Sequence, residues 1–176
     1  MFNLQPITLS NELIKLVPLK EDDFEKLFQV ASDPLIWEQH PTRNRYQRDI
    51  FQNYFNGAVE SKGAFVVYDA QTNEVAGSSR YYEFDELNRT IKIGYTFIAR
   101  KYWGKGYNPE LKSLMMNYAF QFVDSIIFEI GAKNIRSQIA MERIGGIKIG
   151  EGDVAYSGEQ ANRNFIYKID KIDKKS

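Results

Sequence analysis

The sequence predicts one mixed α/β domain built around a single central sheet. Its 176 residues, 43% of them hydrophobic, suffice for one domain with a sizeable core. Apolar patterns follow the order strand, two helices, three strands, helix, strand, helix, two strands, and no linker-like segment interrupts them. We therefore expect a single domain over residues 1–176 with its core at about 13–169, and a mostly antiparallel sheet of about six to seven strands flanked by about four helices.

The first part of the chain predicts one strand and two helices. Residues 14–19 alternate between apolar and polar and predict the strand. Three acids at 21–23 suit the N-terminus of a helix, and apolar residues at helical spacing continue it to Ala31. Asp33-Pro34 ends that helix and begins a short turn through Trp37. The apolar residues of 50–59 predict a second helix that ends near Gly63.

The middle of the chain predicts an antiparallel meander. Residues 64–69, 75–84 and 90–98 are rich in aromatic and β-branched side chains. Turn residues separate them. Because short turns join strands that run in opposite directions, these three strands should be neighbours in the sheet.

The last third predicts two more helices and three more strands. A strongly amphipathic helix ends at 122, with Asn108 expected as its N-cap and Pro109 as its first helical residue. The remaining expected elements are a strand at 125–130, a helix at 134–144 closed by Gly145-Gly146, a hairpin pair at 147–150 and 165–169, and a charged, frayed tail at 170–176.

Composition narrows the classes of function. Lys and Arg number 23 and so do Asp and Glu, and the resulting zero net charge weakens a nucleic-acid-binding interpretation. The chain has no cysteine, which excludes a thiol nucleophile and a disulfide scaffold and fits a reducing compartment, here expected to be the cytoplasm. With a single histidine we expect no metal site. We find no signal peptide and no apolar stretch as long as a membrane span.

One short motif points to an anion. In KYWGKGYN, residues 101–108, two glycines and two lysines directly precede an expected helix. Glycines let consecutive N–H groups point at one ligand, and the positive end of the helix dipole adds to them, which favours a phosphate or pyrophosphate. The alternative is an ordinary turn. The pattern matches neither GxxxxGK[ST] nor GxGxxG.

Four stretches together resemble one enzyme family. They are ASDPLIW at 31–37, IGYTFIARKYWGKGYN at 93–108, NIRSQIAMERIGG at 134–146 and YSGEQANRNFIY at 156–167. In order and spacing they resemble the GNAT superfamily of N-acetyltransferases, and within it most of all the branch of ribosomal-protein N-terminal acetyltransferases.

The resemblance implies acetyl-CoA as cosubstrate and a set of residues that bind it. The loop would bind the pyrophosphate, largely through backbone amides, and the strand before it would pair with the pantetheine arm and polarise the thioester carbonyl. Asn134 would hydrogen-bond near the pantetheine, and Ser137 would lie near the sulfur. The residues so implied are Phe97, Ile98, Lys101, Trp103, Gly104, Lys105, Gly106, Tyr107, Asn108, Asn134 and Ser137.

The catalytic residues are less clear than the binding loop. Ser137 is the position-matched proton donor, and its alternative role is to cap the helix. Lys92 stands where the family often has a carboxylate, and Met141 stands near the place of a family tyrosine. Glu83 and Glu129 remain as candidate bases, although a solvated or ion-paired role is the alternative for each.

The missing carboxylate also bears on the acceptor. A lysine amine has a pKa of about 10.4 and is almost wholly charged at neutral pH, whereas a peptide α-amine, at about 8, is partly neutral. A site without a base therefore favours an α-amine or another weakly basic amine.

The resemblance places the acceptor beside the loop between the first two helices. It implies Trp37, His40, Tyr82 and Tyr156 as acceptor-binding residues, with ordinary loop or sheet packing as the alternative. The expected function is direct acetyl transfer to a primary amine, a protein N-terminus or a small molecule, in a ternary complex. A non-catalytic acyl-CoA-binding module is the alternative, and the aromatic-rich surface is compatible with a homodimer.

Overall fold

Seven strands form one sheet in the computed structural model, which describes residues 1–7, 9–156 and 159–172. Their order across the sheet is β1-β2-β3-β4-β5-β7-β6. The strands are β1 (Ile14–Pro18), β2 (Ala64–Asp69), β3 (Val75–Asp85), β4 (Thr90–Ile98), β5 (Ser125–Gly131), β6 (Ile147–Val154) and β7 (Asn162–Asp170). All neighbouring strands are antiparallel except β4 and β5, so the predicted mixed α/β fold is confirmed.

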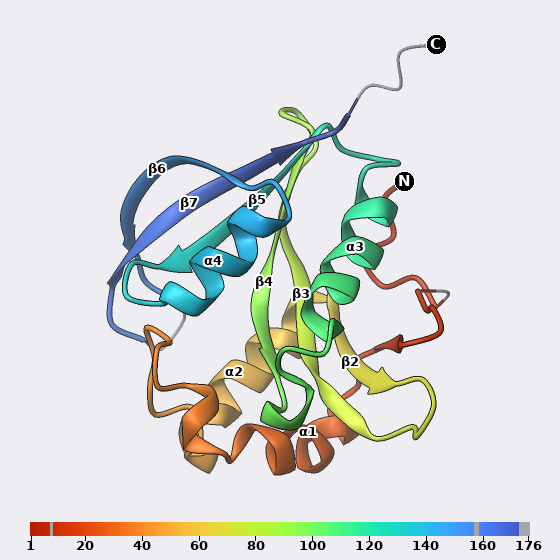
Figure 1. The fold of residues 1–176 in the computed structure, drawn as a ribbon, viewed down its shortest axis with the longest axis vertical. Helices are drawn as coiled ribbons and strands as arrows, with labels where there is room; N and C mark the ends of the chain where they lie inside the picture. Colours follow the sequence, from red (N-terminus) through yellow and green to blue (C-terminus); the bar gives the residue numbers. More distant parts are fainter. Residues whose placement is uncertain (8, 157–158, 173–176) are drawn as a thin grey trace.

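Four α-helices cover the two faces of the sheet (Figure 1). They are α1 (Phe24–Ala31), α2 (Arg48–Ser61), α3 (Tyr107–Ala119) and α4 (Ile135–Arg143), and short 3₁₀ turns occupy Glu21–Asp23, Pro34–Ile36 and Arg100–Tyr102. Helices α1 and α2 lie behind the sheet in Figure 1, whereas α3 and α4 lie in front of it. Each face therefore has its own hydrophobic cluster.

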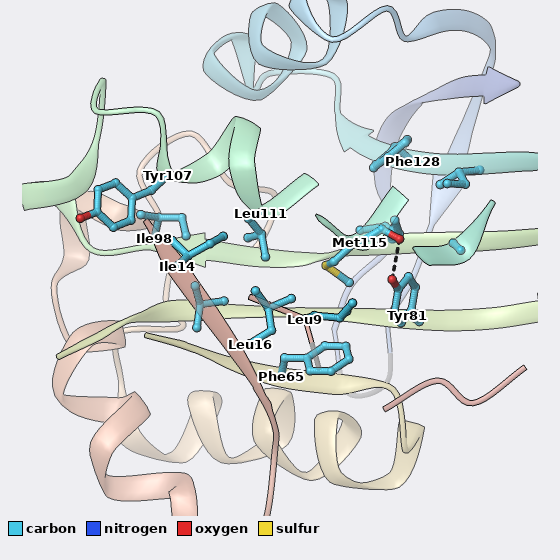
Figure 2. Packing of buried hydrophobic residues seen from close by; sticks show 14 of the residues in the cluster. Leu9, Ile14, Leu16, Phe65, Tyr81, Ile98, Tyr107, Leu111, Met115 and Phe128 are labelled. Carbon is cyan, nitrogen blue, oxygen red and sulfur yellow. Dashed lines mark hydrogen bonds between the residues drawn. The ribbon is translucent and has the colours of Figure 1, made fainter. Parts of the chain in front are cut away.

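The cluster on the α3 face is continuous from β1 to β5. Leu111 and Met115 of α3 are fully buried against Ile14 and Leu16 of β1 and other core side chains (Figure 2). The hydroxyl of Tyr81 donates a hydrogen bond of 2.6 Å to the carbonyl of Met115, so its polar end is satisfied inside this core. Helix α3, which begins at the glycine-rich loop, is thereby fixed to the sheet.

The start of α3 and the extent of the final hairpin differ from the expectation. Helix α3 begins at Tyr107 after Gly106, whose φ is 85°, so Asn108 is not the N-cap and Pro109 is not the first helical residue. Proline is still tolerated in the first turn because backbone N–H groups there have no acceptor within the helix, so the missing N–H of proline costs no hydrogen bond. The final hairpin is longer than expected, since β6 and β7 continue pairing from Ile147↔Lys168 to Val154↔Asn162 despite the glycines in β6.

Helix α3 ends at Ala119, three residues before the expected end at 122, whereas the end of α4 agrees with the prediction. Gly145, with φ 92°, follows α4 in the left-handed conformation expected of a helix end. In the predicted tail, Asp170 is the last residue of β7, and residues 173–176 lie outside the described residues.

The one parallel pair of strands is short. Strands β4 and β5 pair only at Thr90↔Ser125, Ile91↔Ile126 and Lys92↔Ile127. A bulge follows in β4, where the register with β3 shifts, and Tyr95 has a φ of 53°. Because a bulge bends its strand, β4 turns away from β5, and its backbone edge beyond Lys92 is left without a neighbouring strand.

Candidate active site

A cavity of about 760 Å³ occupies the space between the diverging strands. Most of its walls come from β4, the glycine-rich loop with the start of α3, β5, α4, and the segment around Trp37 to Arg45, and they are completed by Tyr156 and, on β7, Asn164. Such a volume is typical of small-molecule sites.

The glycine-rich loop forms one end of the cavity. Gly104 and Gly106 have φ angles of 70° and 85°, values that side-chain-bearing residues rarely adopt. Among the described residues, the N–H groups of Gly104, Lys105 and Gly106 have no hydrogen-bond acceptor. The side-chain oxygen of Asn108 is buried here and finds no hydrogen-bond donor in the part of the chain that the structure describes. The loop thus presents unused donors at the N-terminus of α3, as an anion-binding site requires.

The loop is held in place by a tyrosine and an aspartate. The hydroxyl of Tyr107 donates a hydrogen bond to the carboxylate of Asp69, which also accepts from the N–H groups of Gln71 and Thr72. The hydrogen bond from Tyr107 is the main reason why the pKa of Asp69 is lowered to about 2, and it raises the pKa of Tyr107 to about 12. The loop is therefore tied to the turn after β2.

The two lysines of the loop do not line the cavity. The ammonium of Lys101 pairs with the carboxylate of Glu74, and Lys105 is exposed. Trp103 does line it, and its indole N–H donates 2.8 Å to the carbonyl of Ile98. The guanidinium of Arg136 lies 3.9 Å from the centre of the Trp103 ring, which links the loop to α4. The part of the loop that faces the cavity therefore consists of glycine backbone together with Tyr102, Trp103, Tyr107 and Asn108, and neither lysine belongs to it.

Helix α4 contributes three of the residues discussed from the sequence. Asn134 is its N-cap, because the side-chain oxygen accepts from the N–H of Ser137 at 3.2 Å, so the cap is not Ser137. Both residues line the cavity. Met141 lines it too and is buried. Phe97 and Ile98 line the opposite wall, on β4.

The far end of the cavity is aromatic and contains a buried arginine. Trp37 is buried, and His40 lies beside it with ring centroids 5.3 Å apart. The Arg45 guanidinium lies 5.6 Å from the Trp37 ring and forms an ion pair of 2.6 Å with Glu159, while its second terminal nitrogen has no partner. Burial, assisted by Arg45, lowers the pKa of His40 well below its ordinary range. His40 is therefore neutral.

A carboxylate lies at the same end of the cavity. Glu129 of β5 accepts hydrogen bonds from the hydroxyls of Tyr156 at 3.2 Å and Tyr82 at 3.4 Å, and from the ammonium of Lys92 at 2.6 Å. Glu83, which is exposed, pairs with the same ammonium. Burial raises the pKa of both tyrosines, so their hydroxyls remain protonated donors. Tyr82, Tyr156 and Glu129 are thus brought together as one group, whereas Glu83 stays at its margin.

Three residues of the cavity were not singled out from the sequence. Arg45 belongs to a polar loop with three arginines, and nothing in the pattern tells which is buried. Tyr95 lies within a strand and turns toward Tyr156, at 4.8 Å between ring centroids, only because of the bulge. Lys112 had a signal: it lies three residues before Met115 and seven before Ala119, on the buried face of α3.

One matched family accounts for this architecture. Residues 14–147 match the family described as "Acetyltransferase (GNAT) domain". The chain belongs to the GNAT acetyltransferase family. It is an acetyltransferase, and the acetyl donor used by the GNAT family is acetyl-CoA.

Individual relatives agree with the family. The chain is 28% identical over 118 residues to the "Uncharacterized N-acetyltransferase p20" of Bacillus licheniformis, a match that covers 64% of this chain and 66% of that protein. A GNAT acetyltransferase from Bacillus anthracis superposes with a TM-score of 0.73 at 22% identity, covering 92% of this chain and 97% of the other. A spermidine N-acetyltransferase from Vibrio cholerae, in complex with CoA and spermine, gives 0.64 at 20% identity, covering 89% and 95%.

The residues of this GNAT domain fit the phosphate end of acetyl-CoA. The unused N–H donors of the loop and the unpartnered oxygen of Asn108 suit a ligand with several acceptors and a hydroxyl or amide donor.

In the part of the chain that the structure describes, no cluster of His, Asp and Glu could hold a metal ion. None of the described helices has the length and hydropathy needed to cross a bilayer.

Proposed function

We propose that this GNAT protein transfers the acetyl group of acetyl-CoA directly to a primary amine, with both substrates bound at the same time. The observation that carries the proposal is the cavity between β4 and β5, which has the amide-lined loop at one end and the aromatic group with Glu129 at the other. One cavity thus offers an anion site and an amine site. With no cysteine in the chain, a thiol-linked acyl intermediate is excluded.

The cosubstrate would be held by the loop and by the free edge of β4. Gly104, Lys105 and Gly106 would donate their N–H groups to the pyrophosphate, with Lys101 contributing only long-range charge because Glu74 holds it. Phe97 and Ile98 would pair with the pantetheine arm along the edge that has no strand neighbour. A backbone donor of this edge would polarise the thioester carbonyl, a contribution that leaves little trace in a sequence.

The acceptor would enter at the aromatic end. Tyr95 and Tyr156 supply ring faces, and Trp37 supplies a buried wall. Glu129 is a carboxylate that lines this region, and an ammonium group beside aromatic faces and a carboxylate is favourably bound. Because Lys92 already neutralises Glu129, the site is weakly suited to removing a proton from a strongly basic amine. This supports a protein N-terminal α-amine or a small amine of low basicity.

Two further features remain proposals. The lack of cysteine supports a reducing compartment such as the cytoplasm. Exposed apolar residues, among them Ile147 and Ile149 on β6, support a homodimer through this hairpin.

Calorimetric titration with acetyl-CoA and with CoA tests the donor site. The wild type should bind both with micromolar affinity, and Gly104→Val should abolish binding, because φ 70° strains valine and its side chain covers the free donors. Gly150→Val is the matched control, since nothing lies within 4 Å of its Cβ position and it is far from the loop in the sequence. No binding by the wild type would overturn the proposal.

A second assay tests the acceptor. Peptides with a free N-terminus and no lysine should be acetylated faster than N-blocked peptides with one lysine, and polyamines should be poor acceptors at neutral pH. Faster acetylation of the lysine peptide or of spermidine would overturn the preference for a weakly basic amine, but it would leave the acetyltransferase assignment intact.

A further inference from the structure

Lys112 is a buried lysine that has no carboxylate partner within the described part of the chain. Its residue is 7% exposed, and its Nζ donates a hydrogen bond of 2.6 Å to the hydroxyl oxygen of Thr96. That hydroxyl lies 2.8 Å from the hydroxyl of Ser79, which in turn reaches the carbonyl of Gly94 at 3.5 Å. Lysines are almost never fully buried without a paired charge, so this position calls for an explanation.

Packing alone does not supply that explanation. The neighbours of Lys112 on α3 are Leu111 and Met115, which fill the same face with apolar side chains. A methionine or leucine would fill this position without the cost of desolvating an amine. The hydrogen bond to Thr96 does not require a charge either, because a neutral donor would serve.

The position of Lys112 in the cavity is informative. It lies on α3, one turn after the residues at the amide-rich loop, and it lines the cavity together with Phe128 of β5 and Met141 of α4. Phe128 lies on the α3 face of the sheet, as Figure 2 shows, and Nζ of Lys112 is 5.8 Å from its ring centre. Glu129 follows Phe128 on β5, so its side chain points to the opposite face, where Tyr95 packs against the cluster beneath α1 and α2. Lys112 is therefore on the loop side of the cavity, and the acceptor group is on the other side.

We propose that Lys112 is the proton donor to the thiol of CoA as it leaves. The inference rests on the proposed function, since it requires acetyl-CoA in this cavity. In this step the carbon–sulfur bond breaks, the new carbon–nitrogen bond of the amide is retained, and the sulfur takes a proton from the ammonium of Lys112. The proton lost by the acceptor nitrogen reaches solvent, from which neutral Lys112 is protonated again, so charge and atoms balance.

The environment of Lys112 suits a proton donor near neutral pH. Burial alone lowers its pKa to about 7, close to the pH at which an acid works best. No charged neighbour contributes to this shift: Glu129 of β5 pairs with Lys92 across the sheet, and β4 presents only the Thr96 hydroxyl. The other ionisable side chains that line the cavity are His40, Arg45, Tyr95, Tyr102, Tyr107, Arg136, Arg143 and Tyr156.

The same position explains why a tyrosine on α4 is dispensable here. Met141, at the place where the family resemblance led us to expect that tyrosine, has no proton to give. Lys112 faces the cavity from the opposite helix. Ser137 lines the cavity as well, but a serine hydroxyl is a far weaker acid than an ammonium of pKa about 7. The donor is thus supplied from α3 instead of α4.

The test is a pH titration of the bound CoA thiol, followed by the ultraviolet absorbance of the thiolate. A free thiol of this kind ionises near pH ~8.5, and an adjacent ammonium lowers that pKa. Because Lys112 is itself half neutral near pH 7, the amine and the thiol titrate as a coupled pair, and each charged group favours the charged form of the other. We therefore expect the CoA bound to the wild type to ionise at least about 0.3 pH unit lower than CoA bound to Lys112→Met. Lys112→Gln, which keeps a donor for Thr96 but has no ionisable group, should behave like Lys112→Met, and it serves if the methionine variant does not fold. Lys15→Met, a change of an exposed lysine on β1, should behave like the wild type.

Calorimetry on the same proteins separates the possible failures. If Lys112→Met or Lys112→Gln binds CoA and its thiol ionises at the same pH as in the wild type, the inference is overturned while the proposed function stands. Peptide mass mapping after incubation with acetyl-CoA gives a second criterion: Lys112 should stay unmodified, and an added acetyl group on it would make it an acceptor and refute its role as the acid. If the wild type binds no CoA, the proposed function fails and the inference fails with it.

Discussion

The ammonium of Lys92 lies 2.6 Å from a carboxylate oxygen of Glu129 on the neighbouring strand. Lys92 and Ile127 form the last residue pair before β4 and β5 diverge, and Glu129 lies two residues beyond it on β5. In the sequence, Lys92 occupies the position on β4 where the family often has a carboxylate. The structure shows that Glu129 of β5 supplies a carboxylate in the same region and that Lys92 neutralises it. Burial opposes the charge on Lys92, but its hydrogen bonds to Glu129 and Glu83 outweigh burial and raise its pKa.

Breaking this ion pair from one side should destabilise the protein. Lys92→Met leaves the carboxylate of Glu129, with its side chain 8% exposed, facing two tyrosine hydroxyls and no cation. We expect a loss of about 2 kcal/mol in the free energy of unfolding, below the range for fully buried pairs because Lys92 is partly exposed. Urea denaturation measures it.

The double variant Lys92→Met/Glu129→Gln is the control for that prediction. It should recover part of the loss, because no buried charge remains, and the coupling energy should be on the order of 1 kcal/mol. Additive losses in the double variant would show that the pair contributes no specific interaction.

A second prediction concerns Lys112 and the pH dependence of stability. Its pKa is lowered from 10.5 to about 7 in the folded protein, so between these values the unfolded chain binds more protons than the folded one. Stability must therefore rise with pH across that window, by up to about 1.4 kcal/mol per pH unit from this residue. The stability of Lys112→Met should not rise in this way, and its free energy of unfolding should exceed that of the wild type by the largest amount near pH ~7.

Urea titrations at several pH values between about 7 and 9 measure the effect. The upper limit avoids the ionisation of the unfolded tyrosines, whose pKa is about 10. Equal slopes of stability against pH for the wild type and Lys112→Met would show that Lys112 is not desolvated in solution.

The sequence predicted the scaffold of the site better than its chemistry. Elements such as β4 and α4 were predicted closely because their apolar periodicity and end residues are local signals. The loop was predicted because Gly104 and Gly106 allow a backbone conformation with positive φ, and the structure shows both residues in it. Such features depend on residues that are close together in the chain, so they can be predicted from a single sequence.

The partners of individual side chains could not be predicted. Lys101 was expected to bind the ligand but pairs with Glu74, which is 27 residues away in sequence. Ser137 was expected as a possible helix cap and Asn134 as a ligand contact, but the side-chain oxygen of Asn134 accepts from the N–H of Ser137, which makes Asn134 the cap. Arg45 is buried because Glu159, over a hundred residues later, reaches it. Such contacts depend on tertiary folding and leave no periodic trace.

A third prediction concerns the hydrogen bond that anchors the loop. Tyr107→Phe removes the donor to Asp69, so the loop should lose order and CoA should bind several-fold more weakly. The pKa of Asp69 is lowered from 3.8 to about 2, chiefly by this bond. Its contribution to stability is therefore complete above its unfolded value and is lost as the pH falls toward about 2.

Acid-induced unfolding tests the same bond without any ligand. Without the Tyr107 hydroxyl, the pKa of Asp69 in the folded protein should lie closer to its unfolded value. The free energy of unfolding of Tyr107→Phe should therefore fall less than that of the wild type as the pH is lowered over that acid window. Tyr46→Phe, in which no recorded hydrogen bond is removed, is the matched control. If Tyr107→Phe had the same acid slope and the same CoA affinity as the wild type, Tyr107 would not anchor the loop.

The last prediction concerns the close approach of β3 to β4 beside the cavity. A Cβ at Gly77 would lie 2.0 Å from the carbonyl oxygen of Phe97 and 3.1 Å from the Cα of Ile98, both backbone atoms that cannot rotate away. Gly77→Ala must therefore displace the end of β4 that we propose to pair with the pantetheine. We expect a loss of about 3 kcal/mol in stability, at the upper end for overpacking, together with weaker CoA binding.

Gly152→Ala, with open space around its Cβ, should change stability by less than about 0.5 kcal/mol and leave CoA binding unchanged. Urea denaturation and calorimetry on both variants measure these effects. If Gly77→Ala matched the control in both, β4 would not need its observed position to bind CoA.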